Sequence, residues 1–389
     1  MTRFLELLTS VLIVAVLFVV VGAFLPDQRS VQHSVETSHP LRQVFDTLNS
    51  FKRFAEWNPL RQHDPSVRYE ISGADRGVGA RLDYASNRRE IGSGSWHITD
   101  SVEDDQIRYT VYNDAQGRNK NHTITLDQRG KIVVIDWKYT VDYGWSLPGR
   151  YAGLYVDRTV GDDVKRSLGN ISNLLASMPN FDYRNLEVHV TALPPSNVLY
   201  ISTTAERNIT AVENAMDTAL KDIRAAVASN NLRESGPPRL ITTNFGAEKY
   251  EFDIAVPVAT KQDVDDDEDE VVDTSEAVAD ADEADDADAE ETAEAKVASS
   301  DDIDLSAPPP LEGLKLPDNI HLGQSYGGRV VSAPFQGHPA ALPLIRDQLR
   351  AYAAAFGEHV QDRPFEEYLT EISETAAEDA RFRVYWPVK

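Results

Sequence analysis

The residues best suited to chemistry in this chain lie in the short run 365–369, Phe-Glu-Glu-Tyr-Leu. If this run forms a strand, its alternation places Glu366 and Tyr368 on one face and the other three residues on the opposite face. A carboxylate beside a phenol on an aromatic face can hold a cation through charge and through the ring quadrupole. A register shift of one residue would exchange Glu366 with Glu367. The alternative interpretation is a solvated Glu366 on a strand whose aromatic residues are ordinary core.

Aromatic side chains elsewhere supply candidate walls for two ligand pockets. In the C-terminal half we select Tyr200 and Trp386, with Phe245 and Tyr385 as further candidates. In the N-terminal half we select Trp57 and Trp96, with Trp137 and Trp145 as further candidates. Each of these residues, taken alone, is more often packed in a core than in contact with a ligand.

The motifs of metal and cofactor chemistry are missing from the sequence. The chain has no cysteine, its nine histidines are scattered, and His-Glu-x-x-His does not occur. Nucleotide-binding glycine loops and the Gly-x-Ser-x-Gly elbow are absent as well. We therefore expect no metal and no cofactor, and we name no catalytic residue from motifs. Catalysis stays open, because one or two carboxylates can suffice for it.

Two stretches of the C-terminal half, 249–258 and 379–388, share an alternating pattern and end in Pro-Val. The same order of expected elements (strand, strand, helix, strand) precedes each stretch. Before the first stretch these elements are 186–190, 198–202, 210–228 and 240–245; before the second they are 321–324, 329–333, 340–356 and 365–371. A doubled unit predicts one pseudo-symmetric domain with a seam between its halves. Convergent side chains at such a seam form ligand pockets.

This half resembles the GyrI-like, AraC-type effector-binding family. The motifs that carry the resemblance are residues 365–369, 382–388, 193–201 and 252–258. The resemblance covers residues 185–389 apart from an acidic insertion at 261–312. It implies two halves that bind small, often cationic or amphipathic molecules between them, with Glu366 as the central pocket acid. Many relatives also carry a helix-turn-helix region, which this chain lacks, so we do not expect a transcription factor.

Residues 29–180 are expected to form a separate folded block. Strand patterns separated by Gly or Asp turns occur at 67–73, 79–85, 94–101, 106–113, 122–128 and 131–143. Apolar residues at helical spacing then mark one face of a long helix, at Val160, Val164, Leu168, Ile171 and Leu175. About six strands followed by a long helix predict a curved antiparallel sheet wrapped on a helix.

The block resembles the START-like SRPBCC family of polyketide cyclases and lipid-transport proteins. The residues that carry the resemblance are 54–59 (Phe-Ala-Glu-Trp-Asn-Pro), 77–82, 94–98, Trp137 and 143–145. The resemblance implies a helix-grip fold with a hydrophobic cavity between the sheet and the long helix. Such a cavity would take a hydrophobic small molecule or a lipid.

The first residues of the chain predict a membrane anchor at 1–28. From Leu7 to Leu25 the only polar residues are Thr9 and Ser10, and as a helix this run spans roughly 28 Å, close to the hydrocarbon thickness. A cleaved signal peptide is the alternative, but the run is long for one. Arg3 before the run weakly favours a cytoplasmic N-terminus. We expect a bacterial inner-membrane protein with its folded parts in the periplasm.

Acidic residues concentrate in one segment. Of the 63 acidic residues, 21 lie between Asp263 and Asp304, beside a single lysine, whereas the net charge of the whole chain is −25. The segment has too few large apolar residues to offset chain entropy, so we expect disorder within the insertion 261–312. A solvated spacer and an arm that recruits a protein partner are both compatible with it. No clustered basic face predicts nucleic-acid binding.

These observations predict an α+β protein with an anchor, a START-like domain and a duplicated GyrI-like domain. Three functions are compatible with it. The first is a membrane-anchored protein that binds an amphipathic or cationic molecule at Glu366 and an apolar molecule or lipid in the START-like cavity. The second is a cyclase-type or hydrolase-type enzyme with Glu366 as general base. The third is a scaffold that works through its acidic arm. We favour binding, because it uses the whole chain.

Overall fold

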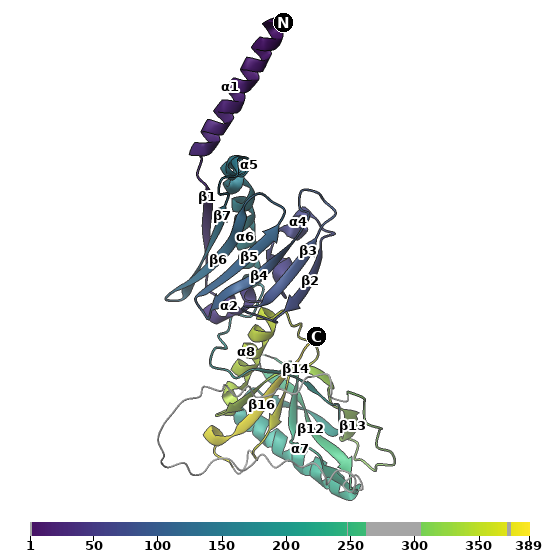
Figure 1. Ribbon diagram of the computed structural model, residues 1–389. Coiled ribbons are helices and arrows are strands. Elements are labelled where there is room, and N and C mark those ends of the chain that lie inside the picture. The colour runs from purple at the N-terminus through teal and green to yellow at the C-terminus, as the bar shows by residue number, and fades with distance from the viewer. Residues whose placement is uncertain (1, 247, 262–304, 372–374) are drawn as a thin grey trace, which may run out of the picture. The chain divides into compact units, whose positions relative to one another are not determined.

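The structure, a computed structural model, describes residues 2–246, 248–261, 305–371 and 375–389 (Figure 1). Most of the acidic insertion, residues 262–304, lies outside the described residues, so its expected disorder stays a prediction. The chain divides into two compact units. The first holds residues 1–186 and 350–359, and the second holds residues 187–349 and 360–389. Each unit contains a large antiparallel sheet, which makes the protein a mixed α+β chain.

The chain begins with one long apolar helix, α1 (Thr2–Phe24). Its stretch Glu6–Phe24, 19 residues long, has a mean hydropathy of 2.9 and is almost entirely exposed. By length and composition, α1 is the one helix in the described part of the chain that could cross a membrane.

The first unit is built on a seven-stranded antiparallel sheet in the order β1-β7-β6-β5-β4-β3-β2 (Figure 1). Six of these strands lie close to the stretches that the alternation predicts. They are β2 (Arg68–Gly73), β3 (Ala80–Ala85), β4 (Ser93–Val102), β5 (Gln106–Asn113), β6 (Arg118–Arg129) and β7 (Ile132–Asp142). Buried residues alternate in β3, β5, β6 and β7, so one face of the sheet turns toward the core, whereas β2 has no buried residue.

The seventh strand, β1 (Gln28–Thr37), was missed by the sequence prediction of about six strands. It pairs with β7 over its whole length, from Gln28 opposite Asp142 to Thr37 opposite Val133. Only Val31 of this strand is fully buried, because β1 lies at the edge of the sheet. An edge strand with so little apolar alternation leaves almost no signal in the sequence.

Helices cover the inner face of this sheet. The long closing helix is α6 (Asp162–Ala176), and it buries Val164, Leu168, Ile171 and Leu175, as their spacing predicts. Val160 precedes it in a π-helical turn (Asp157–Gly161) and is half-buried. The shorter helices are α2 (Leu41–Leu48), α3 (Phe54–Trp57), α4 (Leu60–His63) and α5 (Leu147–Ala152), and a 3-10 turn (Gly153–Tyr155) follows α5.

The second unit contains a nine-stranded sheet among its described residues. Eight strands follow the order β13-β9-β12-β11-β15-β16-β14-β8, and the short β10 (Leu232–Glu234) pairs with β12. In chain order the eight are β8 (His189–Leu193), β9 (Asn197–Glu206), β11 (Arg239–Phe245), β12 (Lys249–Thr260), β13 (His321–Gln324), β14 (Gly328–Gln336), β15 (Phe365–Tyr368) and β16 (Arg381–Pro387). The order of the strands is the same on both sides when it is followed outward from the β11–β15 pair. One side reads β11, β12, β9 and β13, and the other reads β15, β16, β14 and β8.

Two helices alternate with these strands along the chain (Figure 1), and residues 350–355 of the second helix belong to the first unit. The first, α7 (Ile209–Ser229), begins at Asn208, whose side chain accepts a hydrogen bond from the Ala211 backbone N–H and so caps the helix. The second, α8 (Leu342–Ala355), follows a 3-10 turn (Pro339–Ala341). The N-terminal parts of both helices lie near the central strands β11, β12 and β15, because residues of all five elements line one cavity.

Candidate ligand-binding site

The second unit contains a cavity of about 450 Å³ between the N-terminal parts of α7 and α8 and the sheet. Its volume lies within the range of pockets that hold small organic ligands. The apolar wall consists of Ile209, Val212, Met216, Leu240, Phe245, Tyr250, Leu342, Pro343 and Tyr368. Charge enters the cavity from four side chains, which are Arg207, Glu213, Arg346 and Glu366.

Glu366 lies at the centre of the sheet and at the wall of this cavity. It pairs across the ladders with Leu240 on β11 and with Val384 on β16. Its side chain is 0% exposed, and neither carboxylate oxygen has a hydrogen-bond partner among the described residues. A buried carboxylate without hydrogen bonds is costly, so this oxygen pair is a strong candidate for contact with a ligand.

Arg346 of α8 supplies the charge nearest to Glu366. Its Nε atom lies 2.9 Å from Oε1 of Glu366, an ion-pair distance, but the two groups do not meet in hydrogen-bonding geometry. Its Nη1 donates to the Thr242 hydroxyl at 2.7 Å, and its guanidinium lies over the rings of Phe245 and Tyr250. The arginine is thus held from several sides while it faces the carboxylate.

Burial and the interactions among their charges shift the pKa values of Glu366, Arg346 and Tyr250. Burial raises the pKa of Glu366, and Arg346 opposes that rise only in part. Burial works against the charge of Arg346, but Glu366 and Tyr250 raise the pKa of this arginine above its usual value. Burial, followed by the charge of Glu366, raises the pKa of Tyr250 to about 12. The cavity therefore combines a cationic arginine with a carboxyl group whose pKa lies above its ordinary value.

The neighbouring acid, Glu367, lies on the opposite face of β15 and is fully engaged. Arg239 donates to its Oε1 from Nη2 at 2.9 Å, and the Tyr385 hydroxyl donates to its Oε2 at 2.7 Å. Phe365 stacks on Tyr385 on this same face. The alternation expected from the sequence thus appears in the structure, with Glu366 and Tyr368 at the cavity and Glu367 away from it.

Arg346 was not among the residues predicted for this pocket, although the sequence carries a signal for it. The buried positions of α8 include Leu342, Ile345, Arg346 and Leu349, which follow the spacing of one helix face. An arginine on an otherwise apolar helix face is unusual, because charged side chains are rarely buried without a partner. The spacing therefore pointed to a buried partner acid, but it did not identify which one.

Of the other residues predicted for this pocket, two lie outside the cavity lining. Tyr200 of β9 packs against His321, with ring centroids 5.5 Å apart. Trp386 of β16 donates from its indole N–H to the Arg346 carbonyl at 2.8 Å, so it holds the helix turn that carries the arginine. The further candidates divide as well, because Phe245 lines the cavity and Tyr385 binds Glu367 instead.

The first unit contains a smaller cavity of about 180 Å³ beside α6. Trp96 and Trp137 line it, whereas Trp57 is fully buried in the aromatic core against Phe54 and Trp137. Trp145 lies at the surface with 84% of its area exposed. Of the tryptophans predicted to line this cavity, two do so.

Two polar side chains at this smaller cavity, Lys120 and His122, are bonded to the protein itself. The ammonium group of Lys120 donates to the Asn113 carbonyl, to the Asn113 side chain and to the Ala115 carbonyl. The Trp137 indole N–H donates to Nδ1 of His122 at 3.1 Å. Burial lowers the pKa of His122 to about 3, so this imidazole is neutral at physiological pH.

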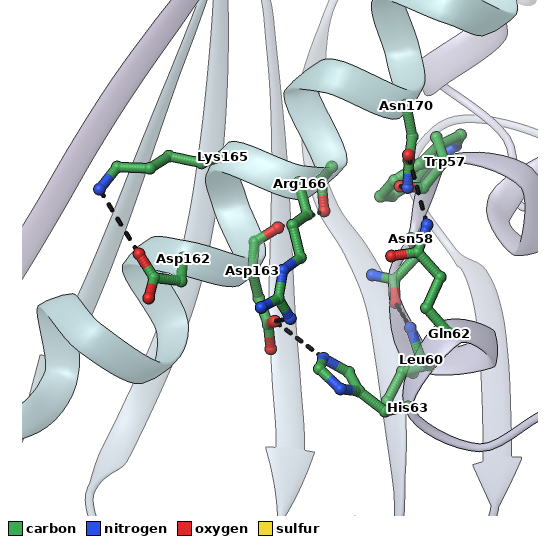
Figure 2. A network of polar contacts seen from close by, with 11 residues as sticks. Trp57, Asn58, Leu60, Gln62, His63, Asp162, Asp163, Lys165, Arg166 and Asn170 are labelled. Atoms are coloured by element: carbon green, nitrogen blue, oxygen red, sulfur yellow. Dashed lines mark hydrogen bonds and ion pairs between the residues drawn. The ribbon is translucent and has the colours of Figure 1, made fainter.

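A network of polar contacts joins α4 to α6 (Figure 2). His63 bonds Asp163 at 2.9 Å, and the side chain of Gln62 donates to Asn170 at 3.4 Å. Asn170 in turn donates to the Trp57 carbonyl at 3.2 Å. The Trp57 motif therefore ties the corner between α3 and α4 to the long helix, which is a structural role.

Comparisons with known proteins give distant likenesses only. No protein-family model and no curated protein matches the chain. The di-domain ARO/CYC StfQ from the steffimycin biosynthetic pathway is 10% identical over 38% of this chain and 50% of its own length, with a TM-score of 0.31. The Aha1 dimer from Colwellia psychrerythraea is 11% identical over 38% of this chain and 96% of its own, with a TM-score of 0.27. The EcmrR C-terminal domain is 9% identical over 52% of this chain and 98% of its own, with a TM-score of 0.35. At these scores the likenesses assign neither a family nor a function to the chain.

Proposed function

We propose that this chain is a membrane-anchored binding protein whose second unit holds an amphipathic or cationic small molecule against Glu366. One observation carries the proposal. The carboxylate of Glu366 is fully buried at the wall of a 450 Å³ cavity, and neither of its oxygens has a hydrogen-bond partner among the described residues. A ligand that donates hydrogen bonds to this carboxylate would remove the free-energy cost of burying it without partners. Ligand binding would therefore also stabilise the fold of the second unit.

The surroundings of Glu366 define the chemistry of this ligand. Arg346 already offsets the carboxylate charge, so the ligand needs hydrogen-bond donors more than it needs a full positive charge. The walls formed by Phe245, Tyr250 and Tyr368 favour an apolar body and attract a cationic head through their rings. An amine or a hydroxyl on a hydrocarbon body meets these requirements, and a carboxylate does not.

We propose that the second unit, residues 185–389, is a duplicated GyrI-like domain interrupted by the acidic insertion. The mirrored order of its eight strands supports this proposal, because β13 pairs with β9 just as β8 pairs with β14. The proposed seam lies between β11 and β15, where Leu240 faces Glu366. The cavity is thus lined from both halves.

We further propose that residues 29–180 form a START-like helix-grip domain and that α1 anchors the chain in a bacterial inner membrane, with both domains in the periplasm. The seven-stranded sheet and α6 support the START-like domain, and the length, apolar composition and exposure of α1 support the anchor. An apolar molecule or lipid in the first unit would need its cavity to widen, because 180 Å³ is small for such a ligand.

The test uses three probes with one hydrocarbon chain and different head groups, namely octylammonium, octanol and octanoate. Calorimetric titration of the full chain in lipid nanodiscs would rank their affinities, and nanodiscs with Glu366→Gln would correct for partitioning into lipid. We expect octylammonium to bind best and octanoate worst, with a loss of roughly 10-fold to 150-fold for octylammonium in Glu366→Gln. Equal binding of octanoate and octylammonium to the unsubstituted chain would overturn the proposal.

An enzyme is the second candidate function, and one observation favours it. A buried carboxyl group with a raised pKa beside a cavity is what a general base requires. Arg346 weakens this candidate, because a cation 2.9 Å from the carboxylate reduces its basicity. Release of product from an ester or lactone probe, lost in Glu366→Gln, would favour the cyclase or hydrolase over the binding protein.

A further inference from the structure

A segment of the first unit, residues 145–155, packs on the C-terminal turns of α1. Tyr151 stacks on Phe18 with ring centroids 4.4 Å apart, and its hydroxyl donates to the Phe18 carbonyl at 2.9 Å. Nearer the end of α1, Gly22 allows the closest approach, since a Cβ there would lie 2.9 Å from Cδ2 of Leu147. The contact therefore extends over the last two turns of the apolar helix.

The one charged residue of this segment, Arg150, turns inward to the end of α1. Its Nη1 donates to the carbonyls of Gly22, Ala23 and Leu25 at 3.4, 2.8 and 3.1 Å. The last carbonyls of a helix have no partner within it, and a cation beside them is favoured by the helix dipole. Arg150 is 6% exposed, so the segment presents no charged side chain to its surroundings.

On another face, α5 packs just as closely on the end of β7. A Cβ at Gly149 would lie 2.9 Å from the ring of Tyr143, and a Cβ at Gly153 would lie 2.8 Å from it. These two glycines are about one helical turn apart. Because neither has a side chain, the Tyr143 ring packs directly against the backbone of the segment at both positions. The segment is therefore fixed to the sheet of the first unit as well as to α1.

The exposed residues of the segment are Trp145, Ser146, Pro148, Ala152, Leu154 and Tyr155, and the three large ones among them are apolar or aromatic. Trp145 is 84% exposed, Leu154 is 52% exposed and Tyr155 is 63% exposed. Tryptophan and tyrosine are enriched where a membrane protein meets the boundary between lipid and water. In water, three such exposed side chains without an intervening exposed charge would be an unfavourable surface.

We infer that residues 145–155 lie in the membrane interface at the end of α1 and form a second lipid contact of the chain. The inference rests on the proposed anchor. Phe18 lies six residues before the end of α1, about 9 Å along the helix axis, so a spanning α1 places Tyr151 at the depth of the lipid head groups and upper acyl chains. Trp145, Leu154 and Tyr155 then point into lipid rather than into water.

The test measures tryptophan fluorescence of the full chain in vesicles of phosphatidylcholine brominated near the head-group end of its acyl chains. We expect quenching that Trp145→Phe removes, because the other tryptophans lie in the folded units. The matched control is Ile132→Trp in the Trp145→Phe background. Ile132 is 42% exposed but begins β7, roughly 33 Å from its other end, so its tryptophan should not be quenched by lipid.

Resistance of the chain to extraction at alkaline pH separates this inference from the anchor itself. Retention in vesicles together with lipid quenching of Trp145 supports both. Retention of the chain without quenching of Trp145 would contradict the interfacial position of residues 145–155 but not the anchor. Equal quenching of Trp145 and of the Ile132→Trp control would have the same meaning. Release of the chain into the supernatant overturns the anchor, and the depth argument fails with it.

Discussion

Two of the cavities, one in each unit, differ in how their polar groups are paired. In the first unit, Lys120 and His122 border a space of about 180 Å³ and are bonded to the protein around them. In the second unit, Glu366 borders a space of about 450 Å³ and has no hydrogen-bond partner among the described residues. A polar group that is satisfied by its own protein stabilises the fold, whereas an unsatisfied buried one costs free energy that a ligand can recover.

The same contrast appears between two adjacent acids. Glu367 has Arg239 and Tyr385 as hydrogen-bond donors, and it faces the apolar cluster around Phe365. Glu366, one residue earlier, has Arg346 at ion-pair distance and no other cation among the described residues. Alternation along one strand thus separates a structural carboxylate from a candidate ligand contact.

The largest effect should follow from Arg346→Met, which leaves Glu366 buried without a counter-charge. We expect a loss of about 3–5 kcal/mol in the unfolding free energy of the second unit at neutral pH. Hydrogen exchange of β15 and β16 would report this loss, and β5 and β6 of the first unit should keep their protection. The double variant Arg346→Met/Glu366→Leu should regain most of the stability. A loss below about 1 kcal/mol in the single variant would show that the carboxylate is not paired as described.

The first unit should lose stability in acid because of His122. Its pKa in the folded state, about 3, lies below the ordinary value of 6.5, so the unfolded chain takes up the proton first. Stability is therefore complete above pH 6.5 and falls as the pH approaches 3, by about 1.4 kcal/mol per pH unit within that window. Exchange of β6 and β7 amides from pH 6.5 to 5 would measure the slope. His122→Phe should flatten it, and an unchanged slope would mean that other groups cause it.

The second unit should respond in the opposite sense through Glu366. Its pKa is raised above the ordinary 4.5, so the folded state keeps the proton longer than the unfolded chain. The stability contributed by this group is present below pH 4.5 and is lost as the pH rises through the raised pKa, by at most about 1.4 kcal/mol per unit. Comparison with Glu366→Gln isolates this component. If the difference between the two proteins grew on acidification instead, the carboxylate would be stabilised in its charged form.

The smallest effect should follow from Tyr200→Phe, which tests the sequence prediction against the cavity. Tyr200 lies beside His321 and outside the cavity lining, so the affinity for octylammonium should change less than about two-fold. Tyr368→Phe serves as the matched comparison, because this phenol lines the cavity. Equal losses of octylammonium affinity in the two variants would show that Tyr200 contacts the ligand.

Several of these features could be read from the sequence for physical reasons. The length and composition of α1 mark it as a helix that could span a membrane, and the alternation of residues 365–369 places Glu366 and Tyr368 on one face. The apolar spacing from Val164 to Leu175 predicts the buried face of α6. These are local patterns, and the burial of a single strand or helix face is enough to produce them.

The remaining features depend on contacts that no local pattern records. Arg346 lies on α8 and Glu366 on β15, so their contact forms only when the helix packs on the sheet. The position of Tyr200 relative to the cavity depends on the register of β9 in the sheet. The edge strand β1 buries too little apolar surface to alternate. The tryptophans divide into core, cavity and surface because of tertiary packing, and composition alone cannot separate these roles.

Native mass spectrometry of the full chain, released from its own membranes, tests the central claim most directly. We predict a small-molecule adduct on the unsubstituted chain that persists in Glu367→Gln and disappears in Glu366→Gln. An adduct that survives Glu366→Gln and disappears when Trp96→Phe alters the first cavity would contradict the account and transfer the ligand to the first unit.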